Sequence, residues 1–187
     1  MKTLKLMLIV PIMALFIQTI AAKDKTNGLY LTRQDYLDHK LSYGDNNYKI
    51  KVNGFFENNY VVVIHEGQKQ VLLKNNIFGY SKYGKDYRFF DNTEYRIMQN
   101  KGLTIYSRIN LVLQGKGPRP TEQYYFSSNL SAPVQPLSIA NLQSVFEKNK
   151  KFVYAVESSF KKDYNLLAFD TCNKEYKLID LYMQNAM

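Results

Sequence analysis

A change in the spacing of apolar residues near position 130 constrains the fold more than any other feature of this sequence. Upstream, Tyr, Phe and Val occur in short runs separated by Gly and Asn, and residues 60–64 form a β-branched run typical of a strand. Downstream, Ile139, Leu142, Val145 and Phe146 recur at helical spacing. The pattern predicts an α+β fold. We expect a small antiparallel β-barrel or sandwich of about eight or nine short strands, followed by a C-terminal helical segment of two or three helices.

Turn residues divide the first part into its expected strands. Asn53-Gly54 and Glu66-Gly67 are hairpin-turn pairs, and Thr32 is a candidate cap for one helical turn. Residues 115–120 and 131–136, rich in Gly and Pro, are predicted loops. The expected strands cover residues 29–31, 48–52, 60–64, 70–73, 77–80, 86–90, 95–98, 103–107 and 123–127.

The tail is expected to form helices that pack on the sheet. Ser138 is a candidate N-cap for the first, and a stripe from Phe152 to Phe160 marks the second. Asp163 is a candidate cap for a third helix, whose inward face would hold Leu166, Phe169, Cys172, Tyr176 and Ile179.

The N-terminus has the three-part pattern of a secretory signal peptide. A basic start with Lys2 and Lys5 precedes an apolar run over residues 6–17, and small residues follow, with cleavage expected after Ala22 or Ala21. An uncleaved N-terminal anchor is the alternative. The expected organisation is a signal peptide over 1–22, a β-rich domain over 23–130 and a helical segment over 131–187. The mature protein would be exported, periplasmic or secreted, without a transmembrane segment, and no Cys lies near the cut for a lipid anchor.

Charge and cysteine content narrow the choice of partners. The 187-residue chain has a formal net charge of +9 and one cysteine, Cys172, so an intramolecular disulfide is excluded. A positive field favours anionic partners. An A/T-rich genome would also enrich lysine and tyrosine, but it does not enrich arginine, so the arginines are the better functional signal.

The leading hypothesis is a non-enzymatic binding module for an envelope protein or an anionic polysaccharide. Strand alternation puts Arg88 on the opposite side from Tyr87 and Phe89, so Arg88 should point outward if the aromatic residues are core. Nucleic acid is not an expected partner for an exported protein. The candidate binding residues lie on the tyrosine- and arginine-bearing face of the β part: Arg88, Arg96, Arg108, Tyr80, Tyr87, Tyr95 and Tyr106.

Motifs for metal or cofactor chemistry are incomplete in this sequence. His65-Glu66 begins like a zinc-protease helix motif, but Lys69 stands where the second His is needed. We expect no metal, no cofactor and no catalytic residues, and Cys172 to be a buried, inert thiol. A hydrolase acting on envelope material and a carrier of a small apolar ligand remain alternatives. The hydrolase would draw on Glu57, Glu66, Asp86, Asp91, Glu94 and His65.

Several aromatic stretches resemble a group of exported proteins of unassigned function from the Bacteroidota. These are Asn27 to Thr32, Lys40 to Tyr43, Ile77 to Tyr80, Tyr87 to Phe90, Tyr95 to Ile97, Ile105 to Arg108 and Leu137 to Phe146. The resemblance implies export and a shared fold, and it implies no activity, cofactor or site residue.

Overall fold

Nine strands occupy the described chain between Gly28 and Ser127, which confirms the predicted antiparallel β region. The structure is a computed structural model, and it describes residues 27–44, 47–52, 58–115 and 117–185. The expected signal peptide and the Asn53-Gly54 turn lie outside these residues. The strands are β1 (Gly28–Tyr30), β2 (Tyr48–Val52), β3 (Tyr60–His65), β4 (Gln68–Leu73), β5 (Gly79–Lys82), β6 (Lys85–Phe90), β7 (Thr93–Lys101), β8 (Leu103–Gln114) and β9 (Gly117–Ser127).

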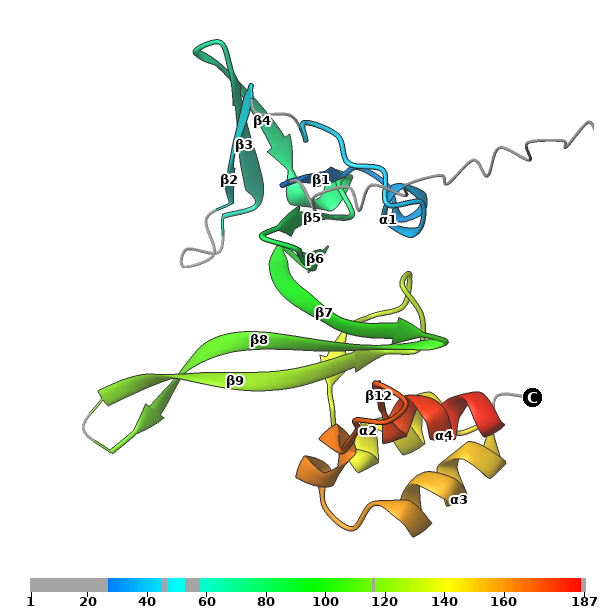
Figure 1. Ribbon diagram of the computed structural model, residues 1–187. Helices are drawn as coiled ribbons and strands as arrows, with labels where there is room; N and C mark the ends of the chain where they lie inside the picture. Colours follow the sequence, from blue (N-terminus) through cyan, green and yellow to red (C-terminus); the bar gives the residue numbers. More distant parts are fainter. Residues whose placement is uncertain (1–26, 45–46, 53–57, 116, 186–187) are drawn as a thin grey trace, which may run out of the picture.

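The strands form two antiparallel sheets instead of a barrel. The larger has the order β1-β5-β6-β7-β8-β9-β10, where β10 is Gln135–Pro136, and the smaller has the order β2-β3-β4. No pairing joins β1 to β10 in the described chain, so the large sheet stays open and the barrel alternative is wrong (Figure 1). Val61 and Val63 of the small sheet pack with Leu29, Tyr80 and Phe89 of the large one, as in a sandwich.

Tight turns fix the register of the hairpins. Glu66 and Gly67 both have positive φ, at 49° and 79°, and so do Tyr83 and Gly84, at 50° and 72°. Two successive left-handed residues form the hairpin turn that suits the natural twist of antiparallel strands. The predicted turn at Glu66-Gly67 is therefore confirmed.

The hairpin of β8 and β9 is longer than the sequence pattern predicted. The expected loop over residues 115–120 is wrong, because β9 begins at Gly117 and contains Pro118 and Pro120. Beyond Ser107, β8 pairs only with β9 in the described chain, so the hairpin projects from the sheet. We call residues 108–114 and 117–123 the arm; Figure 1 shows it extending away from both the small sheet and the helices.

Two layers cover one face of the large sheet, one at each end of the sheet. The small sheet covers β1, β5 and β6, and three C-terminal helices cover β7 to β9 (Figure 1). Leu103, Ile105 and Phe126 of the sheet pack there against Leu142 and Phe152 of the helices. The helices are α2 (Ile139–Val145), α3 (Lys150–Ser159) and α4 (Lys177–Asn185).

The opposite face is covered by a short helix and a loop. Helix α1 (Arg33–Leu37) begins at Thr32, whose hydroxyl accepts a hydrogen bond from the Asp35 N–H, as predicted for a cap. Tyr36 of this helix packs with Tyr30 and with Leu130 of the loop after β9. The large sheet therefore has two covered faces.

The predicted third helix is wrong over most of its length. Asp163–Leu167 forms a 3-10 turn, η2, and a small hairpin of β11 (Phe169–Asp170) and β12 (Glu175–Tyr176) follows before α4 begins. Cys172 lies in the turn of that hairpin and is exposed, which corrects the expected buried thiol. The carboxylate of Asp170 accepts the N–H of Cys172 at 2.8 Å, so local turn hydrogen bonds replace the helix.

The first predicted helix is confirmed at its cap. The Ser138 hydroxyl accepts the Asn141 N–H at 3.1 Å, at the start of α2. None of the helices in the described chain is both long and apolar enough to cross a membrane.

Candidate binding pocket

Four side chains stand in a row across the large sheet, because the strand register places them directly opposite one another. Tyr80 on β5 is opposite Tyr87 on β6, Tyr87 is opposite Arg96 on β7, and Arg96 is opposite Ser107 on β8. Directly opposite residues in antiparallel strands point to the same face. Three of the seven predicted binding residues, Tyr80, Tyr87 and Arg96, are thus brought together.

A pocket of about 610 Å³ opens along this row. It lies on the face that carries the small sheet at one end and the helices at the other. Val52 of the small sheet contributes to one wall, and Ile109 and Leu111 of the arm contribute to another. The remaining lining residues are Tyr80, Lys82, Lys85, Tyr87, Glu94, Arg96, Ser107, Arg108, Asn110, Pro120 and Glu122.

Two stacked tyrosines make the aromatic part of the pocket. The rings of Tyr80 and Tyr87 are nearly parallel, with 4.6 Å between their centroids. The Tyr80 hydroxyl donates to Glu94 Oε2 at 2.7 Å. Burial, and then the charge of Glu94, raise the pKa of Tyr80 well above its usual value. Tyr80 is therefore a fixed neutral donor.

Arg96 is the cation at the centre of the row. Burial raises the pKa of Tyr87, Tyr124 and Tyr176, and in each case the positive charge of Arg96 opposes that rise. Tyr176 belongs to β12, so the charge of Arg96 acts on tyrosines of β6, β9 and the helical segment. These neutral tyrosines do not offset the positive charge of Arg96, which can attract an anionic ligand.

Cations outnumber carboxylates around the pocket. Lys82, Lys85, Arg96 and Arg108 carry four positive charges, against the negative charges of Glu94 and Glu122. The Glu122 carboxylate accepts the Tyr124 hydroxyl at 3.1 Å. This charge balance favours an anionic group in the pocket.

The predicted outward position of Arg88 is wrong. Arg88 does lie on the face opposite Tyr87, but that face is covered too, and its side chain is only 5 % exposed. The guanidinium donates to the Tyr106 hydroxyl at 2.8 Å and to the Ala132 carbonyl oxygen at 2.9 Å. Its positive charge also lies 5.4 Å from the ring centre of Phe90. Arg88 is a structural residue that ties the loop after β9 to the sheet.

Tyr106 and Tyr95 share that opposite face, and neither lines the pocket. Tyr106 is fully buried, and its hydroxyl lies 2.9 Å from the Ser127 hydroxyl. Tyr95 packs edge-on to Tyr106 with 6.1 Å between ring centroids. Burial raises the pKa of Tyr95, and the neighbouring charge of Arg108 opposes that rise. Arg108 therefore stands at the border between the two faces, since it also contributes to the pocket lining.

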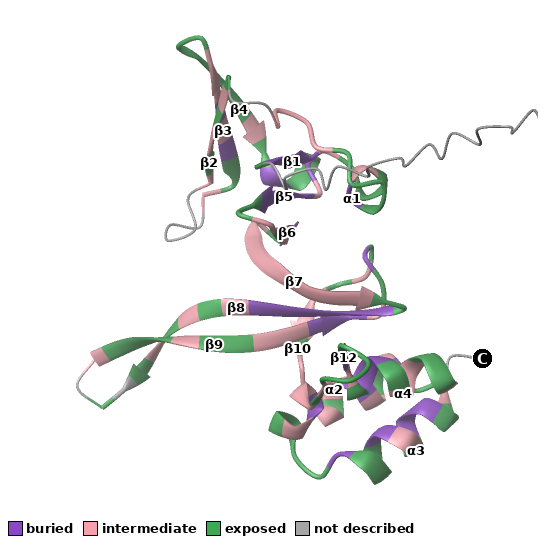
Figure 2. Cartoon of the chain, in the orientation of Figure 1, coloured by how far each residue is buried: buried purple, intermediate pink, exposed green. Residues whose placement is uncertain are grey.

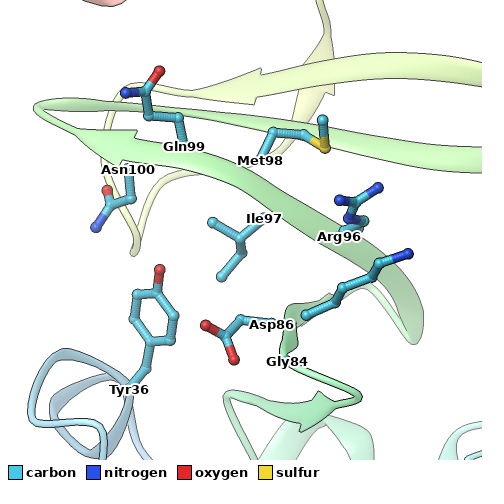
Figure 3. Close-up of a pocket in the computed structure, with 9 residues that line it drawn as sticks. Tyr36, Gly84, Asp86, Arg96, Ile97, Met98, Gln99 and Asn100 are labelled. Atoms are coloured by element: carbon cyan, nitrogen blue, oxygen red, sulfur yellow. The ribbon is translucent and has the colours of Figure 1, made fainter. Parts of the chain in front are cut away.

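A second, smaller pocket of about 330 Å³ lies between α1 and β7. Figure 3 shows Tyr36, Asp86, Ile97 and Asn100 around this space, while the guanidinium of Arg96 turns away from it. The Asp86 carboxylate accepts the Tyr30 hydroxyl at 3.0 Å. Lys85 and Arg96 also contribute to this pocket, but it is smaller, holds one carboxylate and is not faced by the Arg96 guanidinium, so it is the weaker candidate.

The residues of the hydrolase hypothesis are dispersed over the molecule. Glu57 lies outside the described residues. Of the remaining five, only Glu94 lines the larger pocket and only Asp86 lines the smaller one. His65 stacks on Tyr48 at 4.4 Å between centroids. No group of three or more metal-ligating side chains occurs in the part of the chain that the structure describes.

The sequence analysis did not single out the lysines and arm residues of the pocket. Lys82, Lys85, Ile109 and Leu111 come together only through the bend of β7 and the extension of β8. Alternation over residues 109–113 was the available signal, since Ile109, Leu111 and Leu113 are spaced as one face of a strand.

Comparison with protein-family models, curated proteins and solved structures returned no match.

Proposed function

We propose that this chain is a non-enzymatic, exported binding module whose larger pocket takes an anionic group of its ligand. The observation that carries the proposal is the row of Tyr80, Tyr87 and Arg96 in a pocket where cations outnumber carboxylates. The signal-peptide pattern and the resemblance to exported Bacteroidota proteins support export. A partner protein is the favoured ligand, because the pocket continues onto an exposed apolar strand face; an anionic polysaccharide is the alternative.

The chemistry of the pocket supports binding over hydrolysis. Glu94 and Glu122 each accept a tyrosine hydroxyl, and no histidine lines the pocket. A carrier of a small apolar ligand would need an enclosed apolar interior, whereas this pocket has a charged lining.

The test is equilibrium binding of two probes, polyglutamate and polygalacturonate, at low and at physiological salt. Arg96→Gln and Lys85→Gln should each weaken binding of the accepted probe about tenfold, because each removes one charged contact. Lys151→Gln is the matched control, since Lys151 is an exposed lysine on α3. Equal loss in all three variants, or no binding of either probe at low salt, would contradict the proposal.

A further inference from the structure

The prolines of β9 determine which backbone groups of the arm face outward. Pro118 is opposite Leu113 and Pro120 is opposite Leu111. A hydrogen-bonded pair in an antiparallel ladder needs an N–H from both residues, and proline has none. These pairs are therefore of the non-hydrogen-bonded type, in which the N–H and C=O groups of both residues point away from each other.

An independent hydrogen bond agrees with this assignment. Tyr124 has the same parity as Pro120 and Pro118, so its carbonyl should point to the outer side of β9. It accepts the Leu137 N–H at 2.9 Å, from the chain that follows β10.

The two edges of the arm therefore differ. On β9, Pro118 and Pro120 remove two outward N–H groups, a common protection against strand addition. On β8, the N–H and C=O groups of Ile109, Leu111 and Leu113 point outward. No strand pairs with this edge beyond Ser107 within the described ranges.

The side chains of the same three residues are exposed apolar groups. Ile109 is 71 % exposed, Leu111 59 % and Leu113 84 %, whereas Leu103 and Ile105, on the same face of β8, are fully buried under the helices. Figure 2 shows this change from buried to exposed along β8. The apolar stripe thus continues beyond the layer that covers it.

The direction of the open edge leads into the pocket. Going along β8 from Leu103, its pairing with β7 ends at the pair Arg96–Ser107. The part of β7 before Arg96 pairs with β6 alone. A strand added antiparallel to the open edge of β8 would run in the direction of β7, with its C-terminal end arriving beside Arg96. Its last carboxylate would then meet the positive charges of Arg96, Lys85 and Lys82.

We propose that the arm binds an extended segment of a partner protein, which adds to β8 as an antiparallel strand and places a carboxylate at its C-terminal end in the larger pocket. This rests on the proposed function, since it uses the same pocket. Backbone hydrogen bonds to Ile109, Leu111 and Leu113 hold the segment, and its apolar side chains extend the exposed stripe. A second copy of this chain is a poorer occupant, because two strongly basic copies repel each other.

The carboxylate has two sources, the end of a chain or an acidic side chain. Three peptides of alternating Thr and Val distinguish them: one with a free C-terminus, one amidated, and one amidated with Asp as its last residue. If only the peptide with a free C-terminus binds, the pocket recognises the end of a chain. If the amidated peptide that ends in Asp binds as well, the pocket accepts a carboxylate from either source. Equal binding of all three would overturn the role of the carboxylate.

Leu111→Pro tests strand addition on the full chain. It removes an outward N–H without removing a β8–β9 hydrogen bond. The affinity for the peptide with a free C-terminus should therefore fall about tenfold or more. Leu111→Thr keeps the N–H and introduces a β-branched side chain that favours a strand, so peptide affinity should stay within about threefold of that of the unaltered protein. Leu113→Pro, nearer the tip, repeats the test if Leu111→Pro does not fold.

The outcomes separate this inference from the proposed function. Loss of peptide binding in both Leu111→Pro and Arg96→Gln supports the inference. Retained peptide binding in both proline variants, or failure of every peptide to bind, overturns it. Polygalacturonate or polyglutamate binding that Arg96→Gln weakens and Leu113→Pro, outside the pocket lining, leaves unchanged would then keep the proposed function and identify the pocket as a site that does not use the arm.

Discussion

Single residues carry opposite roles on the two faces of the large sheet. Arg96 and Arg88 lie on neighbouring strands, yet Arg96 lines a pocket while Arg88 is buried among neutral acceptors. Strand alternation correctly put Arg88 on the face opposite Tyr87. It could not reveal that the loop after β9 covers that face, because the contacts with Ala132 and Ser127 join residues far apart in sequence.

Replacement of Arg88 should destabilise the protein. Arg88→Ala leaves the Ala132 carbonyl and the Tyr106 hydroxyl without their donor, and we expect a loss of about 2–4 kcal/mol in the free energy of unfolding. Arg88→Lys should recover less than half, because a single ammonium does not reproduce the planar fork. Urea unfolding measures both. A loss below about 0.5 kcal/mol for Arg88→Ala, the scale of an ordinary surface substitution, would show that the network is not structural.

Two glycines with similar backbone angles form a matched pair. Gly102 has φ of 81° and Gly67 has φ of 79°. A Cβ on Gly102 would lie 2.6 Å from Cε1 of Tyr182, whereas nothing lies within 4 Å of one on Gly67. Gly67→Ala should cost about 1 kcal/mol, the price of the left-handed backbone alone, and Gly102→Ala should cost about 1–3 kcal/mol more from overpacking. Equal thermal shifts in the two variants would contradict the contact with Tyr182.

At the scale of elements, β8 joins a buried strand to an exposed one. Local pattern was enough to predict most strands before residue 107, the turn at Glu66-Gly67 and the caps at Thr32 and Ser138. It failed where the decisive interaction was not local. Residues 115–120 looked like a loop, but Pro118 and Pro120 sit where β9 needs no N–H. After Asp163 the apolar residues have helical spacing, yet they lie in a 3-10 turn and a short hairpin before α4 begins.

The two halves of β8 should respond differently to truncation. Ile105→Ala removes a fully buried side chain from the core under the helices, and should cost about 2–5 kcal/mol. Leu113→Ala, on the same face but 84 % exposed, should change stability by less than about 0.5 kcal/mol. Chemical denaturation of the two variants tests this. A large loss for Leu113→Ala would mean that the arm packs on the rest of the molecule.

At the scale of the whole molecule, the pocket occupies the gap between two covering layers. The sequence identified four of its residues, Tyr80, Tyr87, Arg96 and Arg108, because they recur on strands with aromatic neighbours. The gap itself depends on how far the small sheet and the helices extend over a twisted sheet, and short-range sequence pattern carries no information on that.

Buried tyrosines should limit the stability of the whole fold at alkaline pH. Burial raises the pKa of Tyr36 to about 12, and raises that of Tyr30 and Tyr80 as well. The unfolded chain loses these protons near pH 10 while the folded chain keeps them, so the free energy of unfolding should fall from about pH 10 upward. Thermal unfolding across this range, with tyrosinate absorbance, measures the effect. Tyr36→Phe should make the fall shallower up to about pH 12; an unchanged slope would contradict the role of Tyr36.

The unequal edges of the arm also set a stoichiometry. A ribbon with two receptive edges can accept a strand on each side, and each newcomer presents a fresh edge of its own, which is how fibres grow. Here the side with Pro118 and Pro120 is closed and the side with Leu111 is open. Only one strand can therefore add directly to the arm of each copy of this protein, which then lies at the end of a sheet and never between two added strands.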